Sequence, residues 1–174
     1  LLITELKEEC DALSTDGFRV LAIAYRDMDQ RAAYSKDDEH ELVLKGYVAF
    51  LDPPKETAAP AILALRNHGV GVKTLTGDNE LVSRKICQEV GLSTECVLLG
   101  GQVETMSDPE LAAAAEKTTL FARLSPAHKQ RIIRALQSSG HVVGFMGDGI
   151  NDAPALKAAD VGISVDSAVD IAKE

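Results

Sequence analysis

Three short segments of the sequence carry side chains that could act on a phosphoryl group. The first is Thr76-Gly77-Asp78, which follows an apolar run and precedes a helical pattern. A hydroxyl group beside backbone N–H groups at the start of a helix is typical of an anion-binding site. The same residues are also typical of a simple helix cap, so this segment alone leaves both interpretations open.

The second segment, Gly147 to Asp152, is the strongest chemical signal in the sequence. Asp148 and Asp152 place two carboxylates four residues apart, with the amide of Asn151 beside them. Mg²⁺ takes hard oxygen ligands, commonly one or two carboxylates together with water and substrate oxygens. The glycines on either side of Asp148 let the backbone turn tightly around it. This segment therefore predicts a magnesium site.

The third segment contains Lys129, in the first turn of a helix that begins at Ser125-Pro126. Its ammonium group is a compact positive charge that suits a phosphoryl oxygen. A lysine on a helix is most often only solvated, so Lys129 indicates a phosphate site only in combination with the other two segments. Together the three segments offer a hydroxyl, a cation and an acidic pair, which phosphoryl transfer uses for positioning and charge stabilisation. They contain no nucleophile.

The pattern from residue 47 onward predicts a parallel α/β fold. Short apolar strands alternate with amphipathic helices, a rhythm typical of a Rossmann-like parallel sheet with helices on both faces. The expected strands are 47–51, 72–75, 97–99, 120–122, 142–146 and 161–165. In such sheets the ligand binds at the carboxyl ends of the strands. We therefore expect Thr76, Lys129 and Asp148 to converge at one edge of the sheet.

Residues 1–46 have a different pattern. They predict a helix ending near Asp16-Gly17, followed by an apolar run over residues 18–25 and a polar loop over residues 27–41. Residues 42–51 then have the pattern of a strand. We therefore divide the chain into residues 1–46 and residues 47–174.

The composition argues against several classes of function. The 174 residues carry a formal net charge of −9, which disfavours nucleic acid as a partner because such binding depends on Lys and Arg. The sequence has no run of about 18 apolar residues, so it predicts no membrane-spanning helix. Its three cysteines lack metal-binding and C-x-x-C spacing, which is typical of thiols in a reducing cytosol: Cys10, Cys87 and Cys96.

The order of these motifs resembles the haloacid dehalogenase superfamily and, within it, the P-type ATPases. Asp52-Pro53-Pro54-Lys55 is similar to their D-P-P-[RK] segment, and residues 147–154 to their G-D-G-x-N-D-A-P motif. The strings F-L-D-P-P-K-E-T and L-T-G-D-N-E-L-V look most like the bacterial magnesium-transporting branch. The resemblance covers nearly the whole chain.

The resemblance implies a cytoplasmic domain of an integral pump of the bacterial inner membrane. Its cofactors would be ATP and Mg²⁺, its transported cation Mg²⁺, and its partners the actuator, nucleotide-binding and transmembrane domains of the same pump. Residues 1–46 would be the end of the nucleotide-binding domain, and residues 47–174 an incomplete phosphorylation domain.

The resemblance also implies a role for each site residue. Asp148 and Asp152 would hold Mg²⁺, with Asn151 beside them. The phosphoryl group would be bound by Thr76, Gly77 and Lys129. At the nucleotide end of the site the implied residues are Asp52, Asp78 and Arg19, the last of which would meet the ATP phosphates.

One part of the family pattern is missing. P-type ATPases phosphorylate the Asp of a D-K-T-G-T segment, and no such string occurs here. The resemblance therefore implies a piece of a longer protein whose phosphorylated Asp lies upstream, and we expect the chain alone to be inactive. The missing segment forms the central strand of the family's sheet. We expect re-pairing across the gap, partial disorder, or a dimer that fills it.

Two alternatives remain open from the sequence. In Asp27-Met28-Asp29 the first Asp follows an apolar run, as the nucleophile of a free-standing superfamily phosphatase would, although Arg31 stands where Thr or Val is expected. The chain is also compatible with a non-catalytic module that binds a nucleotide or Mg²⁺.

Overall fold

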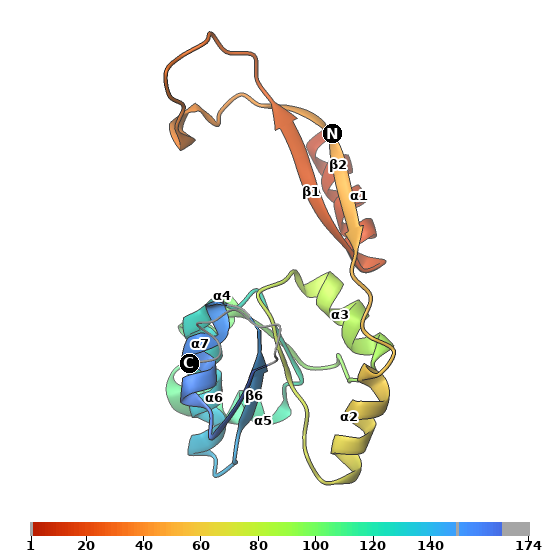
Figure 1. Ribbon diagram of the computed structural model, residues 1–174, viewed down its shortest axis with the longest axis vertical. Coiled ribbons are helices and arrows are strands. Elements are labelled where there is room, and N and C mark those ends of the chain that lie inside the picture. Colours follow the sequence, from red (N-terminus) through yellow and green to blue (C-terminus); the bar gives the residue numbers. More distant parts are fainter. Residues whose placement is uncertain (1, 149, 165–174) are drawn as a thin grey trace. The chain divides into compact units, whose positions relative to one another are not determined.

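The computed structural model describes residues 2–148 and 150–164, and the chain forms two compact units (Figure 1). The first unit is Leu1–Pro53 and the second is Pro54–Glu174. The boundary that we expected between residues 46 and 47 falls inside a strand of the first unit.

The first unit is one helix beside an antiparallel hairpin. Its elements are α1 (Leu2–Thr15), β1 (Phe18–Tyr25), a 3₁₀ turn η1 (Lys36–Asp38) and β2 (Val43–Leu51). The β1 and β2 strands pair along their whole length, with a bulge between Ile23 and Ala24. The Tyr47 hydroxyl donates to the Leu6 carbonyl of α1 at 3.3 Å. Residues 47–51, which we expected to begin the parallel sheet, thus belong to this hairpin, because their pairing partner is β1.

The second unit alternates strands and helices, as the sequence predicts. Its elements are α2 (Ala58–Asn67), β3 (Thr74–Leu75), α3 (Glu80–Glu89), β4 (Val97–Leu99), α4 (Gly100–Thr105), α5 (Asp108–Lys117), β5 (Leu120–Ala122), α6 (Pro126–Ser138), β6 (Gly144–Gly147), a 3₁₀ turn η2 (Ile150–Asp152), α7 (Ala153–Ala158) and β7 (Val161–Ser164). The expected strands 97–99 and 120–122 match β4 and β5, whereas the short helix α4 was not expected.

The strands that the structure describes in the second unit form two parallel sheets rather than the one that we predicted. One has the order β3-β5-β4 and the other pairs β6 with β7. Within residues 2–148 and 150–164, β3 and β6 do not pair with each other, so the re-pairing that we considered for the missing strand does not occur. The side chains of Leu75 and Val143 nevertheless pack into the same two apolar clusters.

The central strand β5 is covered on both faces. The side chain of Leu120 packs with α2 and α3, and that of Phe121 packs with α5 and α6; both are fully buried. Figure 1 shows α2 and α3 on one side of the strands and α6 and α7 on the other. A third cluster, formed around Ile133, Phe145 and Ala155, joins α6, β6 and α7. This packing fixes the strand ends that carry the candidate site.

None of the helices in the part of the chain that the structure describes combines the length and the hydropathy needed to cross a bilayer.

Candidate functional site

The Thr76–Asp78 loop leaves the end of β3. The Thr76 hydroxyl accepts from the Asp78 backbone N–H at 3.0 Å and donates to the Asp78 carboxylate at 3.1 Å. The cap of α3 is a different residue, Asn79, whose side chain accepts from the Leu81 N–H at 2.8 Å. The N-cap of α3 is therefore neither Thr76 nor Asp78, and Gly77 lies exposed between them.

Lys129 lies in the first turn of α6, as the sequence predicts. A capping box formed by Ser125 and His128 begins this helix, and Pro126 is its first residue. The Lys129 ammonium contacts the Asp152 carboxylate at 2.7 Å, and their side chains are only 12% and 13% exposed. The predicted phosphate-binding cation and a predicted magnesium ligand therefore form an ion pair with each other.

The acidic segment follows β6. Asp148 is exposed immediately after the strand, Asn151 is exposed in η2, and Asp152 precedes α7. A Cβ atom at Gly147 would stand 2.6 Å from the Asp152 Cβ, so the absence of a side chain there lets Asp152 lie over the end of β6. The described residues contain no group of three or more His, Cys, Asp or Glu side chains that could hold a metal ion. A pair of carboxylates with water and substrate oxygens is, however, a common magnesium environment.

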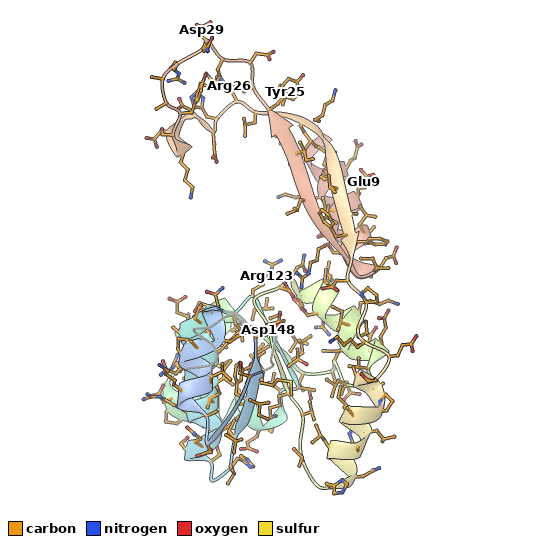
Figure 2. The ribbon with its side chains drawn as sticks, in the orientation of Figure 1. Glu9, Tyr25, Arg26, Asp29, Arg123 and Asp148 are labelled. Atoms are coloured by element: carbon orange, nitrogen blue, oxygen red, sulfur yellow. The ribbon has the colours of Figure 1, made fainter. Side chains whose placement is uncertain are left out.

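Backbone hydrogen bonds connect the loop after β3 to the loop after β5. The Arg123 N–H donates to the Asp78 carbonyl at 2.9 Å, and the Leu124 N–H donates to the Thr76 carbonyl at 3.0 Å. The loop after β5 leads directly into α6 and Lys129, which reaches Asp152. Figure 2 shows Arg123 and Asp148 at the same end of the second unit. The structure thus links Thr76, Asp78, Lys129 and Asp152 through a continuous series of contacts.

Two predicted site residues belong to the first unit. Arg19 is exposed on β1, and Asp52 is exposed just after β2. Arg19 and Asp52 therefore stand on, and just after, the hairpin of the first unit.

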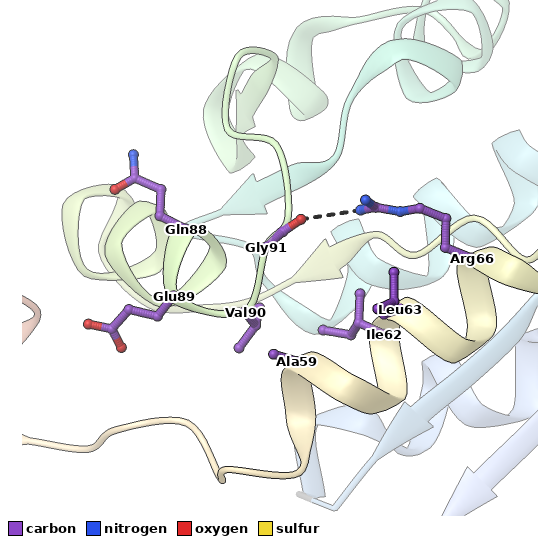
Figure 3. Close-up of a pocket in the computed structure, with 8 residues that line it drawn as sticks. All are labelled: Ala59, Ile62, Leu63, Arg66, Gln88, Glu89, Val90 and Gly91. Atoms are coloured by element: carbon purple, nitrogen blue, oxygen red, sulfur yellow. Dashed lines mark hydrogen bonds between the residues drawn. The ribbon is translucent and has the colours of Figure 1, made fainter.

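A groove in the second unit is not part of this site. It lies between α2 and the end of α3 (Figure 3). The Arg66 guanidinium donates across it to the Gly91 carbonyl at 3.2 Å. Helix α3 begins at the Thr76 loop and ends at the groove, and ten residues of helix span about 15 Å. The groove therefore lies a full helix length from the candidate site.

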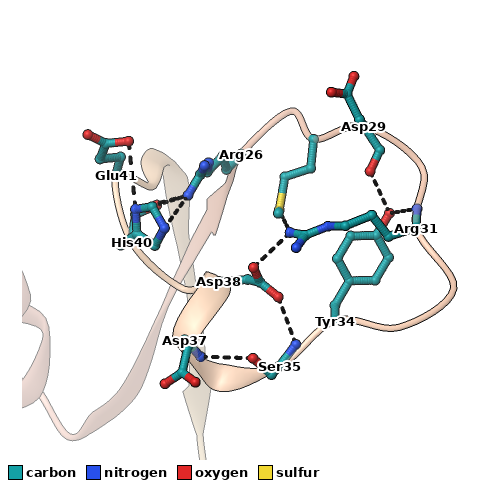
Figure 4. A network of polar contacts seen from close by, with 10 residues as sticks. Arg26, Asp29, Arg31, Tyr34, Ser35, Asp37, Asp38, His40 and Glu41 are labelled. Carbon is teal, nitrogen blue, oxygen red and sulfur yellow. Dashed lines mark hydrogen bonds and ion pairs between the residues drawn. The ribbon is translucent and has the colours of Figure 1, made fainter.

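The Asp27 segment lies in a loop that is organised by its own side chains (Figure 4). The Arg31 guanidinium pairs with the Asp38 carboxylate at 2.7 Å, and the Tyr34 hydroxyl donates to the Asp29 carbonyl at 3.2 Å. Asp27 itself is exposed after β1, and among the described strands β1 pairs only with β2, which is antiparallel to it. Because sites of this fold class lie at the ends of parallel strands, the structure gives no support to Asp27 as a phosphatase nucleophile.

Sequence reasoning missed two residues at this edge. Arg123 adopts a positive φ of 54°, and Gly100 packs against its carbonyl group. Nothing in the local sequence signals a left-handed arginine, and the importance of Gly100 depends on a neighbour 23 positions away in the chain (residue 100 to residue 123).

The family of the chain is identified by its similarity to known proteins. A family model for haloacid dehalogenase-like hydrolases matches residues 4–160, and the chain belongs to this family.

The resemblance to P-type ATPases is confirmed as well. The whole chain is 57% identical to "Magnesium-transporting ATPase, P-type 1" of Escherichia coli strain K12 and spans 20% of that protein. Over 99% of its length it is 57% identical to the protein of the same name in Salmonella typhimurium strain LT2, of which it spans 19%. Over 98% it is 37% identical to "Calcium-transporting ATPase 1" of Lactococcus lactis, of which it spans 20%. The chain is thus homologous to the phosphorylation-domain region of such ATPases and spans about a fifth of their length.

Proposed function

We propose that this chain provides the phosphate- and magnesium-binding loops of the phosphorylation domain in an ATP-driven pump that transports Mg²⁺. The observation that carries the proposal is the Lys129–Asp152 contact of 2.7 Å at the strand edge, where the Thr76 loop is bonded to the loop that opens α6. The transported ion is inferred from the 57% identity to magnesium-transporting ATPases.

Asp148 and Asp152 would hold Mg²⁺, with Asn151 beside them. The close approach of Asp152 to Gly147 supports this assignment, because it brings both carboxylates to the end of one strand. Their hard oxygen atoms are the ligands that Mg²⁺ takes in proteins. When bound, Mg²⁺ would stabilise the negative charge that develops on the phosphoryl oxygens.

Thr76, Gly77 and Lys129 would bind the phosphoryl group. The Thr76 hydroxyl and the Gly77 N–H would donate to its oxygens, and the hydroxyl would exchange its present bond to Asp78 for the new one. Lys129 would approach the same oxygens from the first turn of α6. The Asp152 carboxylate holds the ammonium in place, which keeps the cation at the strand edge before the phosphoryl group arrives.

The carboxylate that receives the phosphoryl group would come from outside this chain, because the sequence contains no D-K-T-G-T segment. Transfer would break the bond between the γ-phosphorus and the bridging oxygen of ATP, and later hydrolysis would release inorganic phosphate. Asp52, Asp78 and Arg19 would order the nucleotide. In the longer protein the first unit would belong to the nucleotide-binding domain, and both units would work with actuator and transmembrane domains at the bacterial inner membrane.

A magnesium titration tests the metal assignment. We expect Asp148→Asn to weaken Mg²⁺ binding by about tenfold or more. At other metal sites, losing a residue that only orients a ligand already weakens binding by about this much. The control is Asp16→Asn, an exposed carboxylate of the first unit that should leave the affinity unchanged. Amide chemical shifts of residues 147–152 would report binding. If both variants bind Mg²⁺ with equal affinity, Asp148 is not a ligand of the metal.

Labelled ATP tests the absence of the nucleophile. We expect the chain alone to acquire no acid-stable phosphate label when it is incubated with γ-labelled ATP and Mg²⁺. A stable label on this chain would show that it contains its own phosphate acceptor.

A further inference from the structure

Arg123 holds a backbone conformation that arginine rarely adopts. Its φ of 54° lies in the left-handed region, which side chains with a Cβ atom disfavour. Such a conformation persists only where the surrounding structure imposes it, and it occurs preferentially at functional sites. Arg123 directly follows β5 and begins the loop that leads into α6 and Lys129.

The turn at Arg123 directs two successive N–H groups at the same neighbouring loop. The Arg123 N–H donates to the Asp78 carbonyl at 2.9 Å, and the Leu124 N–H donates to the Thr76 carbonyl at 3.0 Å. The left-handed residue therefore connects the loop that carries the Thr76 hydroxyl to the segment that leads into α6.

Gly100 holds the other side of this turn. A Cβ atom at position 100 would overlap the Arg123 carbonyl and would stand 2.9 Å from the His128 Nδ1 atom. That nitrogen accepts from the Ser125 N–H at 3.2 Å, within the cap that begins α6. Gly100 is thus in contact with both the Arg123 turn and the first turn of the helix that carries Lys129.

We propose that Arg123 and Gly100 are positioning residues of the phosphate site, which set the separation between the Thr76 hydroxyl and the Lys129 ammonium. Arg123 acts through its backbone, and Gly100 acts through the absence of a side chain. This inference rests on the proposed function, because it assumes that Thr76 and Lys129 bind one phosphoryl group. Small misplacements of such groups weaken their joint action strongly.

Two neighbouring glycines provide a matched pair of variants. In Gly100→Ala the new methyl group must displace the Arg123 carbonyl, whereas at Gly101 an added Cβ would meet nothing within 4 Å. Both residues lie in the first turn of α4, so the two variants change the same helix by one methyl group each. Both are compared under conditions where circular dichroism shows them folded.

The first readout is hydrogen exchange at the Arg123 and Leu124 amides, measured against the Phe121 amide of the preceding strand β5. Gly100→Ala should speed exchange of the first two amides by about tenfold while Phe121 keeps its protection, because only the local bonds open. Gly101→Ala should change none of them. Equal exchange rates in the two variants would show that Gly100 does not hold this turn.

The second readout is the affinity for inorganic phosphate in the presence of MgCl₂, followed by the amide shifts of residues 76–78. Gly100→Ala should bind phosphate about tenfold more weakly than Gly101→Ala. Equal phosphate affinities would overturn the positioning role. If the unmodified chain binds no phosphate, the proposed function fails, and with it the phosphate-positioning role, whereas the exchange readout still decides whether Gly100 holds the Arg123 turn.

Substitutions at Arg123 distinguish a role of its backbone conformation from a role of its side chain. Arg123→Val places a β-branched residue in the left-handed region and should weaken phosphate binding, whereas Arg123→Gly accepts a positive φ without strain. We expect the glycine variant to bind phosphate about fivefold or more tightly than the valine variant. Equally weak binding by both would assign the effect to the guanidinium group and would contradict a backbone role.

Discussion

The two units of the chain bury their apolar residues very differently. Among the described residues, every buried apolar side chain belongs to the second unit, where Phe121, Leu111 and Ile132 are fully inaccessible to solvent. In the first unit Leu21 is 60% exposed and Phe50 is 51% exposed. A two-stranded hairpin with one helix can cover only one of its faces, whereas a layered α/β unit covers both.

The register of the hairpin identifies the open face. Tyr47 lies opposite Ala22 and donates to α1, so this pair faces the helix. Leu21 and Phe50 lie on the other face, together with Arg19, which is opposite Phe50. The predicted site residues therefore differ in how firmly they are positioned. Thr76, Lys129 and Asp152 stand on packed elements, whereas Arg19 and Asp52 stand on or beside a hairpin with one uncovered face.

The largest expected effect comes from the core of the second unit. Phe121→Ala should lower the free energy of unfolding of that unit by about 3–5 kcal/mol, because it removes a fully buried ring and leaves a cavity. Phe50→Ala, the matched change on the hairpin, should cost less than about 1 kcal/mol. Urea unfolding followed by circular dichroism measures both. If the two variants lose similar amounts of unfolding free energy, the distinction between a packed second unit and an open first unit is wrong.

The next effect concerns the ion pair at the candidate site. Lys129→Met should lower the free energy of unfolding by about 3 kcal/mol without Mg²⁺, because it removes the cation that the nearly buried Asp152 carboxylate contacts. Lys85→Met is the control, since Lys85 and Glu89 form an exposed pair at 3.5 Å and should contribute about 0.5 kcal/mol or less.

The double variant Lys129→Met/Asp152→Asn sharpens this test. If the pair is coupled, the double variant should recover about 1–3 kcal/mol relative to the sum of the two single changes. Simple additivity in urea unfolding would show that the contact of 2.7 Å contributes no interaction energy.

A smaller effect depends on pH. The Val143 N–H and the Gln137 side chain donate to the Asp160 carboxylate and hold its pKa below the ordinary value of 3.8. A carboxylate with a lowered folded-state pKa contributes stability above its unfolded pKa and loses it as the pH falls through the folded value. Asp160→Asn should therefore make the acid loss of stability in the second unit shallower below pH 3.8.

The first unit offers a parallel test at low pH. The Ser35 N–H and the Arg31 guanidinium lower the pKa of Asp38 in the same direction. Asp38→Asn should change the acid response of the first unit alone, and Asp160→Asn that of the second alone. Acid titrations followed by amide shifts in each unit distinguish the two. A response of both units to one substitution would mean that they unfold together.

The smallest effect is expected on the open face of the hairpin. Leu21→Thr should change the free energy of unfolding of the first unit by less than about 0.5 kcal/mol, because Leu21 is already 60% exposed. Light scattering on the same variant tests whether this face contributes to self-association. A cost comparable to that of Phe121→Ala would show that the face is covered in solution.

Much of the second unit was predictable because its signals are local. The apolar runs at 97–99 and 120–122 are β4 and β5, and Asn79 and Ser125 cap the helices that the pattern places after them. The helix α4 was missed because its sequence, G-G-Q-V-E-T, begins with two glycines of low helix propensity. Its fully buried Val103 shows that packing, not propensity, stabilises this helix.

Strand pairing was less predictable because it depends on distant parts of the chain. Residues 47–51 form a strand as expected, but local pattern does not distinguish a hairpin with β1 from the start of a parallel sheet. The separation of β3-β5-β4 from β6-β7 likewise could not be read from the apolar runs, since each run specifies a strand and not its neighbour.

The residue types and their order along the chain define the chemistry available to this protein: a hydroxyl, an ammonium group and two carboxylates, each placed after an apolar run. Residue type and motif order are local properties, and they also carried the family resemblance. The pairing of Lys129 with Asp152 and the left-handed turn of Arg123 against Gly100 follow instead from the folded structure. Contacts of this kind join residues more than twenty positions apart, and they depend on how the core brings the strand ends together.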